Sequence, residues 1–184
     1  MKRLFCAVKV HPNAEILEAI LYLQGKLTDE RIKWVNPDNM HLTLKFFGDT
    51  PDKMEPEIIK AFQHAANTMN GFSFELAGFG YFGSRRSPRV LWIGIKQPEG
   101  LQILYKEVNK HLKPLGYTPD KPQFVPHLTV ARIKELKNIN VFHTLIAKHQ
   151  NDHFGKQYIE SFELYHSILR PRGPEYHVVK TFGP

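Results

Sequence analysis

The sequence contains a single cysteine, Cys6, among its 184 residues, so no disulfide can form within one chain. Cys6 lies in the apolar run from Leu4 to Val8, which predicts a buried and unreactive thiol. Lys9 breaks this run, leaving it too short for the core of a signal peptide, and no stretch has the length of a membrane span. These absences predict a cytoplasmic protein.

Several catalytic signatures are also missing. The sequence has no Gly-x-Ser-x-Gly turn, which argues against one common form of serine hydrolase, and no phosphate-binding P-loop. Residues 78–83 read Gly-Phe-Gly-Tyr-Phe-Gly, which superficially matches a dinucleotide fingerprint. That fingerprint must open a helix, whereas residues 85–89 lead into a predicted strand, so we interpret the glycines as a turn.

The charge balance is positive, with 25 Lys and Arg against 18 Asp and Glu, a net charge of +7 and a pI near 9.4. This balance favours an anionic ligand or a nucleic acid, and it is also compatible with an ordinary basic protein. Hydrophobic residues at 42% and charged residues at 23% are typical of a globular chain.

Hydrophobic periodicity predicts an α+β fold with mainly antiparallel sheet. Strands are expected over residues 4–10, 32–35, 41–47, 72–76, 90–95, 127–130, 158–169 and 176–182. Helices are expected over residues 14–27, 52–69, 100–115 and 136–149, with Asn13 as a cap of the first and Asn138 weakening the start of the last. A proline-marked loop spans residues 119–126, and residues 171–174 form a turn.

Two short motifs dominate the sequence, His41-Leu42-Thr43-Leu44 and His127-Leu128-Thr129-Val130. Because side chains alternate along a strand, each histidine shares one face with the threonine two residues later. The motifs lie 86 residues apart, one in each half of the chain, and each follows a proline-containing loop. This arrangement predicts a pseudo-two-fold duplication within a single bilobal domain over residues 1–184, with a central cleft between two sheets and flanking helices.

Paired histidines suit paired general acid and base catalysis, since one neutral and one protonated imidazole can coexist near neutral pH. Neighbouring threonine hydroxyls can donate hydrogen bonds to phosphate oxygens. Neither strand supplies the third ligand that a metal centre needs, so the motifs predict a metal-free site for cleaving a phosphodiester. Either histidine alone is more often a structural residue, and the shared context of the two motifs favours catalysis.

The segments at residues 41–48 and 124–132 resemble the two motifs of the 2H phosphoesterases, and most closely those of the LigT-like RNA 2′,3′-cyclic phosphodiesterases, first described as 2′–5′ RNA ligases. The resemblance extends over essentially the whole chain. It implies a bilobal α+β fold and hydrolysis of an RNA 2′,3′-cyclic phosphate end to a 2′-phosphomonoester, with no metal or cofactor. It also implies that His41 is the proton donor, that His127 is the base, and that Thr43 and Thr129 hold the phosphate.

Three neighbours of the motifs have weaker assignments. Strict alternation places Lys45 on the His41 face, where it can contact phosphate or backbone, and Phe46 on the opposite, core face. It places Arg132 on the face opposite His127, so Arg132 reaches the substrate only through a strand end or a bulge. An Arg132–carboxylate contact that braces the fold is the alternative.

A basic and aromatic segment, with Tyr81 and Phe82 followed by Arg85, Arg86 and Arg89, can track RNA or simply form a solvated loop. The remaining eight histidines have no assigned role. The expected partner is RNA or a nucleotide with a 2′,3′-cyclic phosphate end, with no membrane, no protein partner and a monomeric state. The alternatives are 2′–5′ RNA ligation and a non-catalytic nucleotide- or RNA-binding module.

Overall fold

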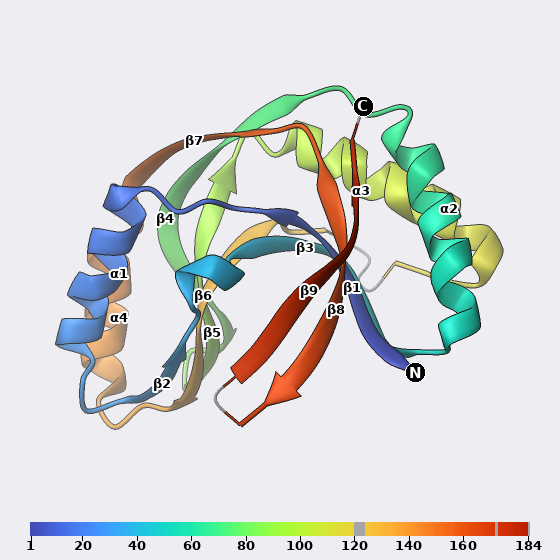
Figure 1. Cartoon of the computed structure of the whole chain (residues 1–184). Helices are drawn as coiled ribbons and strands as arrows, with labels where there is room; N and C mark the ends of the chain where they lie inside the picture. Colours follow the sequence, from blue (N-terminus) through green and yellow to red (C-terminus); the bar gives the residue numbers. More distant parts are fainter. Residues whose placement is uncertain (120–123, 172, 184) are drawn as a thin grey trace.

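The structure, a computed structural model, describes residues 1–119, 124–171 and 173–183. Its strands form two antiparallel sheets (Figure 1). The four-stranded sheet has the order β3-β1-β8-β9 and the five-stranded sheet the order β2-β6-β5-β4-β7. The strands are β1 (Lys2–Lys9), β2 (Arg31–Trp34), β3 (His41–Thr50), β4 (Phe72–Ser84), β5 (Ser87–Lys96), β6 (His127–Glu135), β7 (His153–Ile159), β8 (Phe162–Arg170) and β9 (Gly173–Phe182).

Four helices flank the sheets in two pairs: α1 (Ala14–Lys26), α2 (Glu55–Ala66), α3 (Glu99–Leu112) and α4 (Ile139–Lys148). In Figure 1, α1 and α4 lie together on one side of the molecule, and α2 packs beside α3 on the other. Short 3₁₀ turns cover Pro37–Asn39, Asp52–Met54 and Lys113–Leu115. The predicted helix over residues 52–69 is therefore a 3₁₀ turn followed by the shorter helix α2.

The two halves of the chain exchange strands. In the first half β1 pairs with the motif strand β3, and in the second half β5 pairs with the motif strand β6. The strand that ends the first half, β4, pairs with β5, whereas β8 from the second half pairs with β1. The predicted α+β class, two antiparallel sheets and internal duplication are therefore confirmed. Each sheet contains strands from both halves of the chain.

Strand β1 shows how the core is divided. Its residues Leu4, Cys6 and Val8 point into the main hydrophobic core, which is continuous between the sheets and the helices. Phe5 and Ala7 point to the opposite face and pack in a small separate cluster with Tyr165. Cys6 is fully buried, as predicted, and burial raises the pKa of its thiol.

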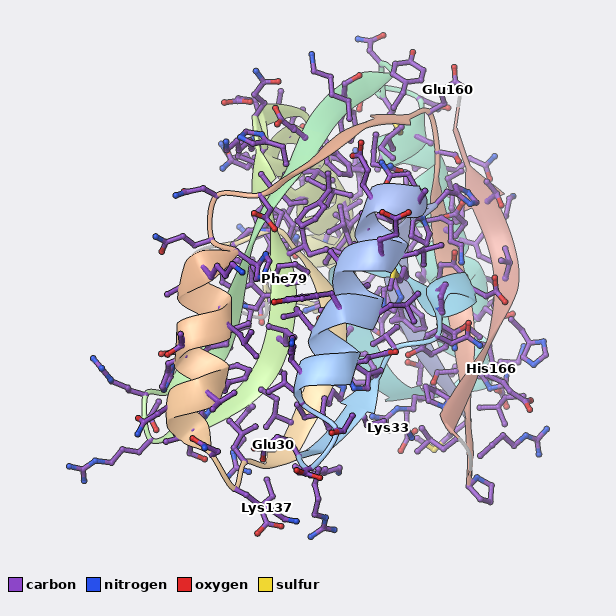
Figure 2. All side chains as sticks on the ribbon, turned by 90° about the vertical axis from the view of Figure 1, so that its left-hand side faces the viewer. Glu30, Lys33, Phe79, Lys137, Glu160 and His166 are labelled. Carbon is purple, nitrogen blue, oxygen red and sulfur yellow. The ribbon has the colours of Figure 1, made fainter. Side chains whose placement is uncertain are left out.

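The helices α1 and α4 each begin at an asparagine that caps the first turn. The Asn13 side chain accepts a hydrogen bond from the Ile16 amide, as expected for a cap. Asn138 does the same for Val141, so it begins α4 rather than weakening it. The Glu30 carboxylate accepts hydrogen bonds from the Lys137 and Asn138 amides, and Figure 2 shows Glu30 and Lys137 close together below α1 and α4.

The glycines at residues 78–83 do not form a turn, contrary to our interpretation, because β4 continues through them to Ser84. Gly78 adopts a positive φ of 69° where the pairing of β4 with β5 is shifted by a bulge. Gly80 leaves room for the Trp92 ring, since a Cβ there would lie 2.2 Å from a ring carbon. These glycines therefore shape a strand.

The single strand predicted over residues 158–169 is also wrong. The chain leaves the five-stranded sheet after Ile159 and enters the four-stranded sheet at Phe162. Both residues are buried, so the apolar pattern continues across the step and hides the change of sheet. The predicted loop at residues 119–126 and turn at residues 171–174 lie partly outside the described residues.

Candidate active site

The two motifs lie on the strands at which the sheets meet. β3 and β6 lie against each other, and each has its histidine at its first residue (Figure 1). His41 pairs with Lys9, and Thr43 with Ala7, on the face of the sheet that points away from the main core. His127 and Thr129 occupy the equivalent positions in β6, opposite Gly94 and Trp92.

The same backbone contact orients both imidazole rings. His41 Nδ1 lies 2.6 Å from the Asn39 carbonyl oxygen, and His127 Nδ1 lies 2.9 Å from the Val125 carbonyl oxygen. In both cases the acceptor is two residues before the histidine. When Nδ1–H donates to this carbonyl, Nε2 becomes the nitrogen that can exchange a proton with a ligand. Two histidines with matched Nε2 atoms are what paired acid and base catalysis requires.

Aromatic side chains pack against both histidines. The His41 ring packs against Phe5, at a centroid distance of 5.0 Å, and against Tyr176, at 5.3 Å, with Tyr165 further away at 6.5 Å. The His127 ring meets Phe82 edge to face at 4.6 Å. Sequence reasoning did not identify these packing partners, since all four lie on strands distant in sequence from the histidine that they contact. They fix the ring positions and keep His41 partly buried.

Burial lowers the pKa of His41 to about 4. The hydrogen bond with Asn39 opposes this shift, whereas the positive charges of Lys9 and Arg132 and the nearby His127 add to it. His41 is therefore neutral in the free protein at neutral pH. The influence of Arg132 and His127, both from the second half of the chain, places the two motifs in one electrostatic environment.

The depressed pKa predicts a pH-dependent stability. In the unfolded chain His41 titrates near 6.5, so between pH 6.5 and 4 the unfolded state binds more protons. The free energy of unfolding should therefore fall as the pH decreases across this range, by about 3 kcal/mol at 1.4 kcal/mol per pKa unit. Urea denaturation at pH 7 and pH 4 measures this loss. The His41→Gln variant should lose about 3 kcal/mol less than the wild type.

Exposed His177 provides a matched control, because His177→Gln should lose as much stability as the wild type. Equal pH dependence in the wild type and His41→Gln would contradict the burial of a neutral His41.

A bulge in β3 changes the faces of the residues after the first motif. The pairing with β1 shifts between Cys6 and Ala7, so Leu44 and Lys45 both point inward. Lys45 is 4% exposed and donates a hydrogen bond of 2.6 Å to the Thr118 carbonyl oxygen. The expected position of Lys45 on the His41 face is wrong, and so is the core position of Phe46. Phe46 is 43% exposed on the His41 face, with the Arg3 guanidinium 4.9 Å from its ring centroid.

An equivalent bulge in β6 brings Arg132 to the His127 face. The pairing of β5 with β6 shifts so that Val130 and Ala131 are both buried, and Arg132 is exposed. The structure therefore contains the bulge that the predicted substrate contact of Arg132 requires. Within the described part of the chain, Arg132 has no carboxylate ion pair, so the bracing alternative receives no support.

Two adjacent pockets open beside His41. One, of about 350 Å³, is lined by Lys9, His11, Glu163 and Tyr165 among others, and the second, of about 310 Å³, reaches Arg132. The hydroxyls of Thr43 and Thr129 have no hydrogen-bond partner among residues 1–119, 124–171 and 173–183. Over those same residues, no group of three His, Cys, Asp or Glu side chains is placed to hold a metal ion, and no helix is long and apolar enough to cross a membrane.

In the basic segment at residues 85–89, Arg85 and Arg86 form the tip of the β4–β5 hairpin and Arg89 lies in β5. Phe82 extends from this hairpin to His127, whereas Tyr81 packs away from it, against Phe142 and His143. Arg85, Arg86 and Arg89 are all exposed.

The paired histidines and threonines on equivalent strands define the class of two-histidine phosphoesterases. The model of the LigT-like phosphoesterase family matches the chain twice, over residues 10–92 and 93–176. The chain belongs to this family, as its motifs predicted. Each of the two matches contains one motif strand, and the boundary between them falls within β5.

Relatives and solved structures agree with this membership. The chain is 35% identical to an Archaeoglobus fulgidus protein named RNA 2′,3′-cyclic phosphodiesterase, over 98% of this chain and 99% of the relative. A protein of the same name from Methanothermobacter thermautotrophicus is 32% identical over 85% of each chain. A Thermus thermophilus crystal structure has a TM-score of 0.78 at 28% identity, with 98% and 97% coverage. E. coli LigT complexed with 3′-AMP has a TM-score of 0.74 at 26% identity, with 99% and 97% coverage.

Proposed function

We propose that this protein hydrolyses the 2′,3′-cyclic phosphate at an RNA end to a 2′-phosphomonoester. The observation that carries the proposal is the matched pair of histidines, each held through Nδ1 by the carbonyl two residues earlier. The relatives named RNA 2′,3′-cyclic phosphodiesterase support the reaction. The complex of E. coli LigT with 3′-AMP supports a nucleotide ligand.

In the proposed reaction, water attacks phosphorus as the bond to the 3′ oxygen breaks. His127 Nε2 takes the proton from the attacking water, and protonated His41 Nε2 gives a proton to the leaving 3′ oxygen. Thr43 and Thr129 donate hydrogen bonds to the non-bridging oxygens, and Arg132 offsets their negative charge. The two histidines supply the acid and the base, so the reaction needs no metal ion.

His41 must gain a proton before it can act as the acid. In the free protein its pKa is about 4, through burial and the nearby positive charges. A bound phosphodiester brings a negative charge next to the ring, which favours the imidazolium and raises the pKa. Substrate binding and proton uptake by His41 are therefore coupled.

Two other functions use the same site. A 2′–5′ RNA ligase would join the cyclic end to a second RNA end in place of water. A non-catalytic module would bind the end without turnover. The presence of both histidines and both threonines favours catalysis over the module.

Incubation with a short RNA that ends in a 2′,3′-cyclic phosphate, in the presence of EDTA, tests the proposal. Conversion to a 2′-phosphate end is the expected result. A joined product would show that the protein is a ligase instead. Binding without turnover would show that it is a non-catalytic module. A cytoplasmic location, a monomeric state and a single domain over residues 1–184 stay predictions. Gel filtration with light scattering measures the oligomeric state directly.

A further inference from the structure

A second pocket lies next to the proposed reaction centre, and of its lining residues the mechanism above uses only Arg132. Its volume is about 310 Å³, and it bridges the two sheets. One wall comes from β2 and β6 and the other from the β8–β9 hairpin. The side chains that matter for its chemistry are Lys33, Arg132, Arg170, Glu175 and Tyr176. In Figure 2, Lys33 lies low in the molecule, between α1 and the β8–β9 hairpin.

This pocket shares a wall with His41. The Tyr176 ring, which lines the pocket, meets the His41 ring edge to face at 5.3 Å. Asn39 also lines it, and the Asn39 carbonyl is the acceptor that orients His41. The Asn39 side chain donates a hydrogen bond of 3.2 Å to the Pro174 carbonyl oxygen, which joins the two walls. A ligand bound at His41 can therefore extend directly into the pocket.

The pocket contains two positive charges in an unfavourable arrangement. Lys33 of β2 and Arg132 of β6 are direct cross-strand partners, and both are exposed. Like charges directly opposite each other destabilise a sheet. The same strand pair has an opposite-charge pair further along, where Arg31 and Glu135 form an ion pair of 3.1 Å.

Within the described residues, no carboxylate compensates the Lys33 and Arg132 charges. The acidic residue that lines the pocket, Glu175, is already paired with Arg170 at 3.1 Å. The pocket therefore has three cations and one carboxylate, and an added anion would relieve the repulsion between Lys33 and Arg132.

We propose that this pocket binds the phosphate on the 5′ oxygen of the terminal nucleotide, the nucleotide whose 2′ and 3′ oxygens form the cyclic phosphate. This inference rests on the proposed function. Because the 2′ and 3′ oxygens are both occupied at the reaction centre, the next phosphate of the substrate can only be on the 5′ side. Lys33 of β2 holds this phosphate, and Arg132 of β6, which also offsets the charge of the cyclic phosphate, adds its positive charge to the same pocket. The preferred substrate is then an RNA end, or a nucleotide with its own 5′-phosphate, rather than a 5′-hydroxyl cyclic nucleotide.

Three substrates test this selectivity: a nucleoside 2′,3′-cyclic phosphate with a 5′-hydroxyl, the same molecule with a 5′-phosphate, and a dinucleotide ending in the cyclic phosphate. For the wild type we expect kcat/KM to be about tenfold higher for each 5′-phosphorylated substrate, as for one charge-assisted contact. Lys33→Gln should remove most of this advantage and leave the 5′-hydroxyl substrate unchanged. A preference for the dinucleotide alone would identify the RNA chain, rather than the free 5′-phosphate, as the ligand.

Salt dependence provides a second measurement. Loss of one phosphate contact should reduce the slope of log kcat/KM against log salt for the dinucleotide by about 0.7. Lys60 is exposed on α2, far from the pocket. Lys60→Gln removes the same charge as Lys33→Gln and should behave as the wild type. Lys33→Gln should fold normally, with an unchanged or higher Tm, because it removes a like-charge repulsion.

The outcomes separate this inference from the proposed function. Equal kcat/KM for all three substrates in the wild type, or an equal loss on all three in Lys33→Gln, would overturn the pocket assignment while hydrolysis stands. Failure of the wild type to hydrolyse any of them would overturn the proposed function itself, and with it the substrate selectivity.

Discussion

His41→Asn and His127→Asn should each lower kcat on a cyclic-phosphate RNA end by about 10³-fold, within the range of 10² to 10⁴ for loss of a general acid or base. Asparagine keeps a side-chain N–H that can donate to the carbonyl that holds Nδ1 in the wild type, but it cannot transfer the Nε2 proton. The fold should persist, and single-turnover rates with bound substrate would measure the chemical step.

His177→Asn is the matched control. Because His177 is exposed, this variant should have an unchanged rate. Retention of more than a tenth of the activity by either the His41 or the His127 variant would rule out its role as acid or base. Loss of activity in one variant alone would show that the two motifs do not form one site.

Arg132→Met should lower kcat/KM by about 10- to 100-fold, because one charge-assisted contact to a charged ligand contributes about 1.5–3 kcal/mol. The same variant should raise the pKa of His41, since the positive charge of Arg132 is one cause of its low value. NMR titration of the His41 ring in the free protein measures the second effect independently of activity.

Lys60→Met, on the distant helix α2, should change neither quantity. A bracing role for Arg132 makes a different prediction, namely a lower Tm with an unchanged kcat/KM in the variant that remains folded. That result would contradict the position of Arg132 beside the substrate.

The sequence predicted the motif strands well because their chemistry is local. Alternation alone places His41 with Thr43 and His127 with Thr129, and the structure has both pairs on equivalent faces. The duplication was also visible, since the two motifs repeat the same context. The family match over residues 10–92 and 93–176 has the same two-part organisation.

The alternation of side chains predicted the wrong faces for the residues that follow each motif, for a physical reason. A single extra residue in a strand reverses the faces of everything that follows. The bulges at Leu44 and Val130 bury Lys45 and expose Phe46 and Arg132. No local signal marks these bulges, because Leu44 and Val130 are ordinary apolar strand residues.

The pairing of strands across the halves could not be predicted either. The partner of β8 is β1, nearly the whole chain away, and the pattern at residues 158–169 continues through the step between sheets. The packing partners of the histidines, such as Tyr176 for His41 and Phe82 for His127, depend on these pairings. They become visible only when the sheets are assembled.

The central claim is that the two motifs form one anion site in which His41 gains its proton from ligand binding. NMR titration of all ten histidines with and without 3′-AMP tests it most directly. The account predicts that His41 and His127 show the largest changes, and that the pKa of His41 rises from about 4 by more than one unit. An unchanged His41 pKa with 3′-AMP bound, or a response of only one of the two histidines, would contradict it.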